Sequence, residues 1–290
     1  MTQTDNDRHL CWERVLRSNK SFRISHLFAP VEYSGPLLAL HALFASIDQL
    51  SSEVSDDLVA RQKLGWWRLE LSPDQMERSR HPVIRHLVET GASAMLPASA
   101  LTAQLDTAER RLDAYPPSNM KEFNQLSRLI YQPRIDLECA LCGLDSAFIS
   151  DHKEVACAGG LLQLLRESLV QANHRFWWIP LDLLARFGAT RQDLRENSDE
   201  HASRAVFRHI LEGGGERPAL QDHRDQLQAA TPPGLLHLQL TALLQTRQLF
   251  HLRGKKPSRF GTELNRWHIS DLMLAWNMAR QNKKKAVTDS

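Results

Sequence analysis

The fold is decided by a stretch that runs from Pro36 to Ile47 and reads PLLALHALFASI. Its apolar side chains recur at helical spacing and keep one apolar face. Pro36 suits the first turn of a helix, where its missing amide hydrogen leaves no bond unmade. The charge-free run from Tyr33 to Ile47 is shorter than the roughly 20 residues needed to cross a bilayer. We therefore predict a helix of a globular domain here, and not a membrane span.

The same helical period continues through most of the chain, whereas alternation with β-branched residues is almost absent. Further helices are predicted at residues 58–71, 83–88, 99–115, 120–141, 154–171, 203–211, 234–249 and 264–282. Pro133 should bend or interrupt the helix that contains it. The Pro and Gly clusters between helices are too short to separate domains. We expect one all-α domain at residues 19–280, a flexible N-terminal tail at 1–18 and a flexible basic C-terminal tail at 281–290.

Composition excludes several classes of protein. In 290 residues the hydrophobic share is 42% and the charged share 24%, which are ordinary globular values. The net charge of +2 gives no large positive field for nucleic acid. Four cysteines favour reduced thiols over a secreted disulfide framework. The polar N-terminal residues do not form a signal peptide. We expect a cytoplasmic protein, at most peripheral on a membrane.

Several blocks of sequence carry a family pattern. They read SF at 21–22, LFAP at 27–30, LLALHALF at 37–44, ARQKLGWWRLEL at 60–71 and IPLDLLARFG at 179–188. Together these blocks resemble the squalene/phytoene synthase family, and the resemblance covers roughly residues 20–280. It implies an isoprenoid-synthase-type helical bundle around a central cavity. It also implies a prenyltransferase, which condenses two prenyl diphosphates head to head.

The chemistry that this resemblance implies depends on Mg²⁺. The first step breaks a C–O bond and leaves diphosphate and a carbocation, so metal ions must neutralise the departing diphosphate. Mg²⁺ prefers oxygen ligands, commonly one or two carboxylates with phosphate oxygens and water. Two aspartates four residues apart lie on one face of a helix and supply such a pair. Two motifs of this kind, on facing helices, would hold the diphosphate between them.

The first of these motifs is altered here. Where the family pattern reads Asp-Asp-x-x-Asp-Glu, this chain reads DQLSSE at residues 48–53. Asp48 and Glu53 remain, but Ser52 stands one helical turn after Asp48. This carboxylate pair has lost one member.

The second motif is altered in the same way. Counted back from Pro180, it falls on RESLVQ at residues 166–171. Glu167 keeps an acid, whereas Gln171 replaces its partner. If each lost charge-assisted contact is worth ~2 kcal/mol, the two losses weaken metal binding ~10³-fold. Asp48 and Glu167 are left as weak candidates for Mg²⁺.

The resemblance thus implies a site for a prenyl diphosphate or another isoprenoid lipid. Its candidate residues are Ser21, Asp48, Ser52, Glu53, Gln163, Arg166, Glu167 and Gln171. One hypothesis is a weakly active or non-catalytic homologue that binds a prenyl-type lipid or acts in assembly through a protein partner. The mitochondrial complex I assembly factor of this superfamily is similar in its weakened motifs. The alternative is an active Mg²⁺-dependent prenyltransferase with altered ligands.

Two further patterns leave alternatives open. Trp177 and Trp178 are packing residues or a patch at a membrane interface, where tryptophan is favoured. Cys139-x-x-Cys142 with His152 and Cys157 would suit zinc. Because only one C-x-x-C is present, within a helical pattern, packing is the favoured interpretation of these cysteines.

Overall fold

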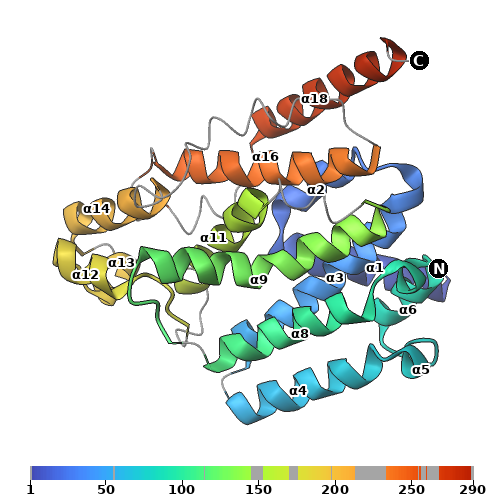
Figure 1. The fold of residues 1–290 in the computed structure, drawn as a ribbon, viewed down its shortest axis with the longest axis horizontal. Coiled ribbons are helices and arrows are strands. Elements are labelled where there is room, and N and C mark those ends of the chain that lie inside the picture. Colours follow the sequence, from blue (N-terminus) through green and yellow to red (C-terminus); the bar gives the residue numbers. More distant parts are fainter. Residues whose placement is uncertain are drawn as a thin grey trace.

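The computed structural model describes residues 2–54, 56–113, 115–144, 153–169, 176–196, 198–212, 233–253, 255, 259 and 268–288. Within these ranges the chain is helical with short connections and contains no strand (Figure 1). The all-α, single-domain prediction is confirmed. The helices are α1 (Gln3–Ser18), α2 (Lys20–His26), α3 (Val31–Glu53), α4 (Asp57–Glu70), α5 (Pro73–Met76), α6 (Pro82–Glu89), α7 (Ala92–Met95), α8 (Ala98–Asp113), α9 (Met120–Leu141), α11 (Lys153–Leu169), α12 (Leu181–Phe187), α13 (Arg191–Glu196), α14 (Glu200–Leu211), α16 (Pro233–Arg253) and α18 (Ile269–Thr288).

Helix α3 forms the centre of the hydrophobic core. Every residue from Leu37 to Ile47 is buried, on all sides of the helix. A helix that is apolar all round is stable in water only when neighbours cover it completely. Helices α1, α4, α6, α8 and α9 provide that cover. The stretch that decides the fold is therefore also its most enclosed element.

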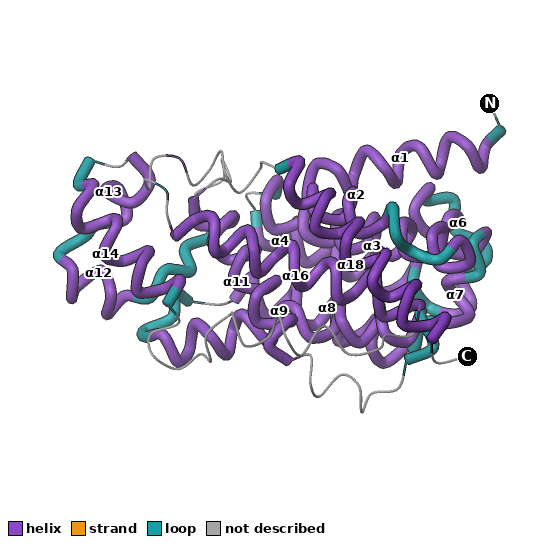
Figure 2. The backbone as a smooth tube through the Cα atoms, turned by 90° about the horizontal axis from the view of Figure 1, so that it is seen from above, coloured by secondary structure: helices purple, strands orange, loops and turns teal. Residues whose placement is uncertain are grey.

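Several long helices lie in a simple spatial order. In Figure 1, helices α4, α8, α9, α16 and α18 follow one another from one edge of the molecule to the other. Helices α12, α13 and α14 gather at one end of the elongated molecule, as Figure 2 also shows. No helix in the described part of the chain is long and apolar enough to cross a membrane.

Helices α9 and α11 approach each other closely because two glycines of α11 face α9. A Cβ atom on Gly160 would be 1.9 Å from the backbone oxygen of Ser127. A Cβ atom on Gly159 would be 2.4 Å from the ring of Tyr131. Only residues without a side chain allow the two backbones to come this near. This contact places the polar residues of α11 against those of α9.

The predicted helices lie on observed ones as far as the structure describes them, but some boundaries were wrong. The helix predicted from Pro36 begins at Val31. Pro133 does not interrupt α9, which runs through it from Met120 to Leu141. Helix α18 continues to Thr288, so residues 281–288 are helical where we expected a tail.

The expected N-terminal tail is also a helix, and the prediction of a flexible segment at residues 1–18 was wrong. Helix α1 packs on α3 and α6, with Cys11 and Val15 fully buried. Asp7 accepts hydrogen bonds of 2.8 and 2.6 Å from the guanidinium of Arg85 on α6. Buried apolar area and a bidentate ion pair fix a segment that its polar composition suggested would be loose.

Candidate functional site

A cavity of about 320 Å³ opens between α1, α3, α9, α11 and α16. This volume is at the lower end of the ~300–1,000 Å³ typical of small-molecule sites. The charged residues in its lining are Arg14, Arg17, Arg134, Arg166, Asp48 and Glu167, and His41 lies in the same wall. The arginines outnumber the carboxylates by two, so the cavity has a positive character suited to an anion.

Five of the residues that the resemblance implied line this one cavity. They are Ser21, Asp48, Gln163, Arg166 and Glu167. Helix α3 contributes Asp48, and α11 contributes Gln163, Arg166 and Glu167 on successive turns. The structure therefore brings the remaining acid of each motif to the same place. Their role toward a diphosphate remains a prediction.

The other three candidates are less well described. Ser52 and Glu53 lie in the last turn of α3, but their side chains are outside the described part of the structure. Gln171 lies outside the described residues altogether. Neither of the altered carboxylate pairs is thus visible as a pair.

Asp48 and Glu167 are joined by a buried arginine of α8. The Nη1 of Arg111 lies 3.3 Å from the Oδ1 of Asp48, and the Nη2 of Arg111 donates a hydrogen bond to the Oε1 of Glu167. Arg111 and Glu167 are only 3% and 2% exposed, and Asp48 is 21% exposed. One guanidinium therefore pairs with both acids on which the metal prediction rested.

Further donors complete this network around both acids. Arg134 of α9 is 2.5 Å from the Oδ1 of Asp48. Gln163 donates to the Oδ1 of Asp48 at 2.9 Å and to the Oε1 of Glu167 at 3.1 Å. The indole nitrogen of Trp178 donates to the Oε2 of Glu167 at 2.7 Å. Charge-assisted bonds of this kind are about twice as strong as neutral ones.

The charges in the network fix its ionisation. Burial by itself would raise the pKa of Asp48, but the positive charges of Arg134 and Arg111 outweigh it and lower that pKa. Burial would lower the pKa of Arg111, but the charges of Glu167 and Asp48 raise it. Asp48 and Arg111 are therefore both charged at neutral pH, and each depends on the other for its stability in the core.

This arrangement does not fit the Mg²⁺ ion that the resemblance implies. The ion needs several oxygen ligands and the negative charge of carboxylates. Here Asp48 and Glu167 are already engaged by guanidinium groups, which would repel a divalent cation at the same position. With these hydrogen-bond donors in place, guanidinium groups occupy the position beside the carboxylates that a metal ion would need.

Sequence reasoning missed the partners of the two acids. Arg111 stands on the face of α8 that also carries Leu101, Leu105 and Ala108, all buried. A charged residue on an otherwise apolar face is a signal of a buried ion pair, and it could have been found. The identity of the partner could not, since Asp48 is 63 residues away in the sequence.

One of the open alternatives is now decided. Trp177 and Trp178 are 2% and 1% exposed, so they are packing residues, and an exposed membrane patch at this position is excluded. Cys139 and Cys142 are buried free thiols near the end of α9. The other members of the suggested zinc set, His152 and the side chain of Cys157, lie outside the described residues.

Comparisons with known proteins agree on the family. A model of the squalene/phytoene synthase family matches residues 15–253. The chain is similar to the human protein named NADH dehydrogenase (ubiquinone) complex I, assembly factor 6, with 21% identity over 203 residues. That match covers 69% of this chain and 61% of the human protein. The Rattus norvegicus protein of the same name is 22% identical over 206 residues, which cover 69% and 62%. The chain thus spans less than two thirds of the length of these relatives.

Two solved structures are similar in fold. One is the squalene synthase HpnC from Alicyclobacillus acidocaldarius, with a TM-score of 0.63, 20% identity and coverage of 87% of this chain and 95% of that one. The other is a dehydrosqualene synthase in complex with a ligand, with a TM-score of 0.69, 15% identity and coverage of 97% and 98%. At these identities the likeness shows a shared fold and leaves activity to be argued from the site.

Proposed function

The chain belongs to the squalene/phytoene synthase family, and from that premise we propose that it is a non-catalytic member. In this proposal it acts in the assembly of a respiratory NADH dehydrogenase through a protein partner. The expected place of action is the cytoplasm, at most at the membrane surface. The proposal has two parts, loss of head-to-head condensation and an assembly role, and they are supported separately.

The loss of catalysis rests on one observation, the position of Arg111 between Asp48 and Glu167. Ionisation of a prenyl diphosphate needs metal ions that carboxylates hold against the leaving group. In this chain a fixed guanidinium takes the place of the ion. The positive charge that Mg²⁺ would supply is instead a permanent part of the fold, where it holds α3, α8 and α11 together.

The assembly role is supported by the relatives. Proteins named complex I assembly factor 6 match about 69% of the chain at 21% identity in human and 22% in rat. A retained fold with a neutralised metal site suits a protein whose surface is used rather than its reaction. The sequence similarity therefore supports the assembly role, and the Arg111 network supports the loss of catalysis.

A second candidate function is metal-independent binding of an isoprenoid diphosphate or another anionic lipid. It is favoured by the excess of arginine in the cavity, including Arg14 and Arg166. Against a long prenyl chain, the cavity wall also carries the polar groups of His41, Tyr131 and Gln245, which are a poor match for an apolar tail. The cavity therefore fits an anionic head better than a hydrocarbon tail.

The catalytic part is tested by incubating the purified protein with Mg²⁺, a nicotinamide reductant and farnesyl or geranylgeranyl diphosphate, followed by product analysis. The dehydrosqualene synthase of similar fold serves as the positive control. We expect no hydrocarbon product. Turnover to a squalene-like or phytoene-like product would overturn this part and establish the active prenyltransferase.

The assembly part is tested in the host organism. Disruption of the gene should reduce the amount of fully assembled NADH dehydrogenase on native gels, and a plasmid copy should restore it. Calorimetry with farnesyl diphosphate, with and without Mg²⁺, separates the second candidate, which predicts binding that does not depend on the ion. Normal assembly in the disrupted strain would contradict the assembly role.

A further inference from the structure

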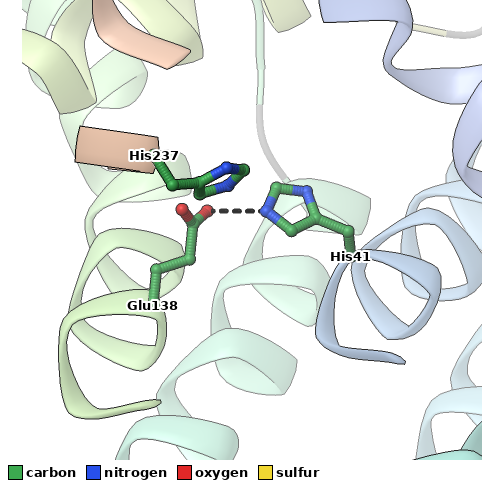
Figure 3. A group of neighbouring side chains, drawn as sticks. All are labelled: His41, Glu138 and His237. Atoms are coloured by element: carbon green, nitrogen blue, oxygen red, sulfur yellow. Dashed lines mark ion pairs between the residues drawn. The ribbon is translucent and has the colours of Figure 1, made fainter. Parts of the chain in front are cut away.

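Three buried side chains from distant parts of the sequence meet beside the cavity. His41 comes from α3, Glu138 from α9 and His237 from α16, and Figure 3 shows the three pointing toward one another. Their exposed fractions are 5%, 1% and 0%. None of them belongs to the network of Asp48 and Glu167. The fold therefore assembles a second polar cluster that the proposed function does not use.

The polar atoms of this cluster are incompletely satisfied. The Nε2 of His41 lies 3.2 Å from the Oε1 of Glu138. Glu138 Oε2 and both ring nitrogens of His237 have no hydrogen-bond partner within the described residues. The carbonyl of Ser25 lies near His237 and favours its protonated form, but without hydrogen-bond geometry. Because a buried polar group without a partner costs about 1–3 kcal/mol, such a group calls for an explanation, commonly a water molecule or an ion.

The geometry matches a metal site. One donor atom from each of the three residues can be chosen so that all lie within 4.8 Å of one another. In a tetrahedral zinc site with bonds of roughly 2.0–2.1 Å, neighbouring donor atoms are roughly 3.3 Å apart. The separation of 3.2 Å between His41 and Glu138 has this value already. The donor atom of His237 lies within 4.8 Å of the other two and would have to move closer to complete three corners of the tetrahedron.

We propose that His41, Glu138 and His237 bind a divalent transition metal ion, with zinc as the ion that best fits the donors. Two imidazoles and one carboxylate are a ligand set that zinc and ferrous iron use when one or more positions remain open. The open position faces the cavity, because His41 is part of its wall. The Tyr131 hydroxyl, which accepts a bond of 2.6 Å from Gln245, belongs to the same wall and can contact a molecule bound there.

The surroundings also limit the approach of water. The ring of Phe22, which is fully buried, packs on both imidazoles, at 4.1 Å from His41 and 5.5 Å from His237 between centroids. The two imidazoles are nearly perpendicular, at 85°. The apolar ring of Phe22 lies against the imidazoles, and His41 also lines the cavity. This is the form of a site with an open ligand position, as distinct from a closed structural site.

The experiment begins with the purified full-length protein, its metal content and its titration with Co²⁺ at pH 7.5 after treatment with a chelator. We expect about one zinc or iron per chain, and visible absorption of tetrahedral or five-coordinate Co²⁺ that saturates at one ion per chain. Zinc should displace the cobalt signal. A folded protein without bound metal and without a cobalt spectrum would overturn the proposal.

Variants identify the ligands. His237→Gln and Glu138→Gln should each weaken Co²⁺ binding by more than the ~10–100-fold that a change outside the ligands costs. The matched control is His86→Gln, since His86 is also buried, neither of its ring nitrogens has a hydrogen-bond partner within the described residues, and Glu89 lies 4.0 Å from it. Its cobalt affinity should be unchanged. If a ligand variant does not fold, Glu138→Asp keeps the carboxylate and should shift the cobalt spectrum. Unchanged affinity and spectrum in the folded variants would refute the assignment.

Discussion

Replacing Arg111 by methionine tests the central feature of the site, the guanidinium that joins two acids. Methionine keeps most of the length and the apolar stem of arginine but removes the charge. Asp48 would keep Arg134 as a cationic partner. Within the described residues, Glu167 would keep only the neutral donors Gln163 and Trp178. A carboxylate that is 2% exposed would then have no ion-pair partner among the described residues, and only the charge of Arg166 nearby.

The expected cost follows from the burial of the network. Removing one partner of a buried ion pair typically destabilises a protein by ~3–5 kcal/mol. With an unfolding entropy of ~2.1 cal/mol/K per residue, a chain of 290 residues should lose ~5–8 °C in Tm.

The same variant tests the idea that arginine stands in place of a metal ion. With Arg111 gone, Mg²⁺ and pyrophosphate together should raise the Tm of the variant, because binding to the folded state stabilises it. In the wild-type protein, adding Mg²⁺ should make no difference to the Tm, with or without pyrophosphate. Differential scanning fluorimetry with and without both additives gives the comparison in one plate.

The control for this experiment is Arg68→Met. Arg68 pairs with Asp106 and Glu109 at 2.6 and 2.7 Å, but it is 33% exposed. An exposed pair contributes up to ~1 kcal/mol, so this variant should lose little stability and ignore Mg²⁺. If Arg111→Met costs no more than Arg68→Met, or if the wild type responds to Mg²⁺ and pyrophosphate as strongly as the variant, the reasoning is refuted.

Three further outcomes are expected. Gly160→Ala should destabilise the protein by ~1–3 kcal/mol in urea melts because its Cβ would meet a backbone oxygen of α9 at 1.9 Å. Gly65→Ala, whose Cβ would meet open space, should be neutral or stabilising, and equal effects of the two variants would contradict the close approach of α9 and α11. Burial lowers the pKa of His237 to about 4, so between pH 6.5 and 4 the unfolded chain takes up this proton more readily than the folded one. The free energy of unfolding of the metal-free protein should therefore fall by roughly 3 kcal/mol over this range. A flat pH profile in chemical denaturation would contradict the buried neutral imidazole. Trp178→Phe removes the indole donor to Glu167 and should cost ~1.5–3 kcal/mol by the same assay, and a negligible change would show that this bond is not formed.

Much of the fold follows from local pattern. The run from Pro36 to Ile47 and the helical period elsewhere were enough to predict an all-α domain, because the side chains of a helix repeat every 3.6 residues wherever the helix lies. The family blocks then indicated Asp48 and Glu167, and the structure places both in one cavity. These are properties that a short window of sequence can carry.

The tertiary structure decided what the acids contact. Arg111 meets Glu167 across 56 residues of sequence, and His41 meets Glu138 across a longer interval. No periodicity encodes such pairs, since they form only when separate helices pack with a given rotation and spacing. For the same reason the polar segment Gln3–Ser18 is a packed helix, held by the burial of Cys11 and Val15 and by the ion pair of Asp7 with Arg85. The sequence determined which residues form helices, and helix packing determined which charges they neutralise.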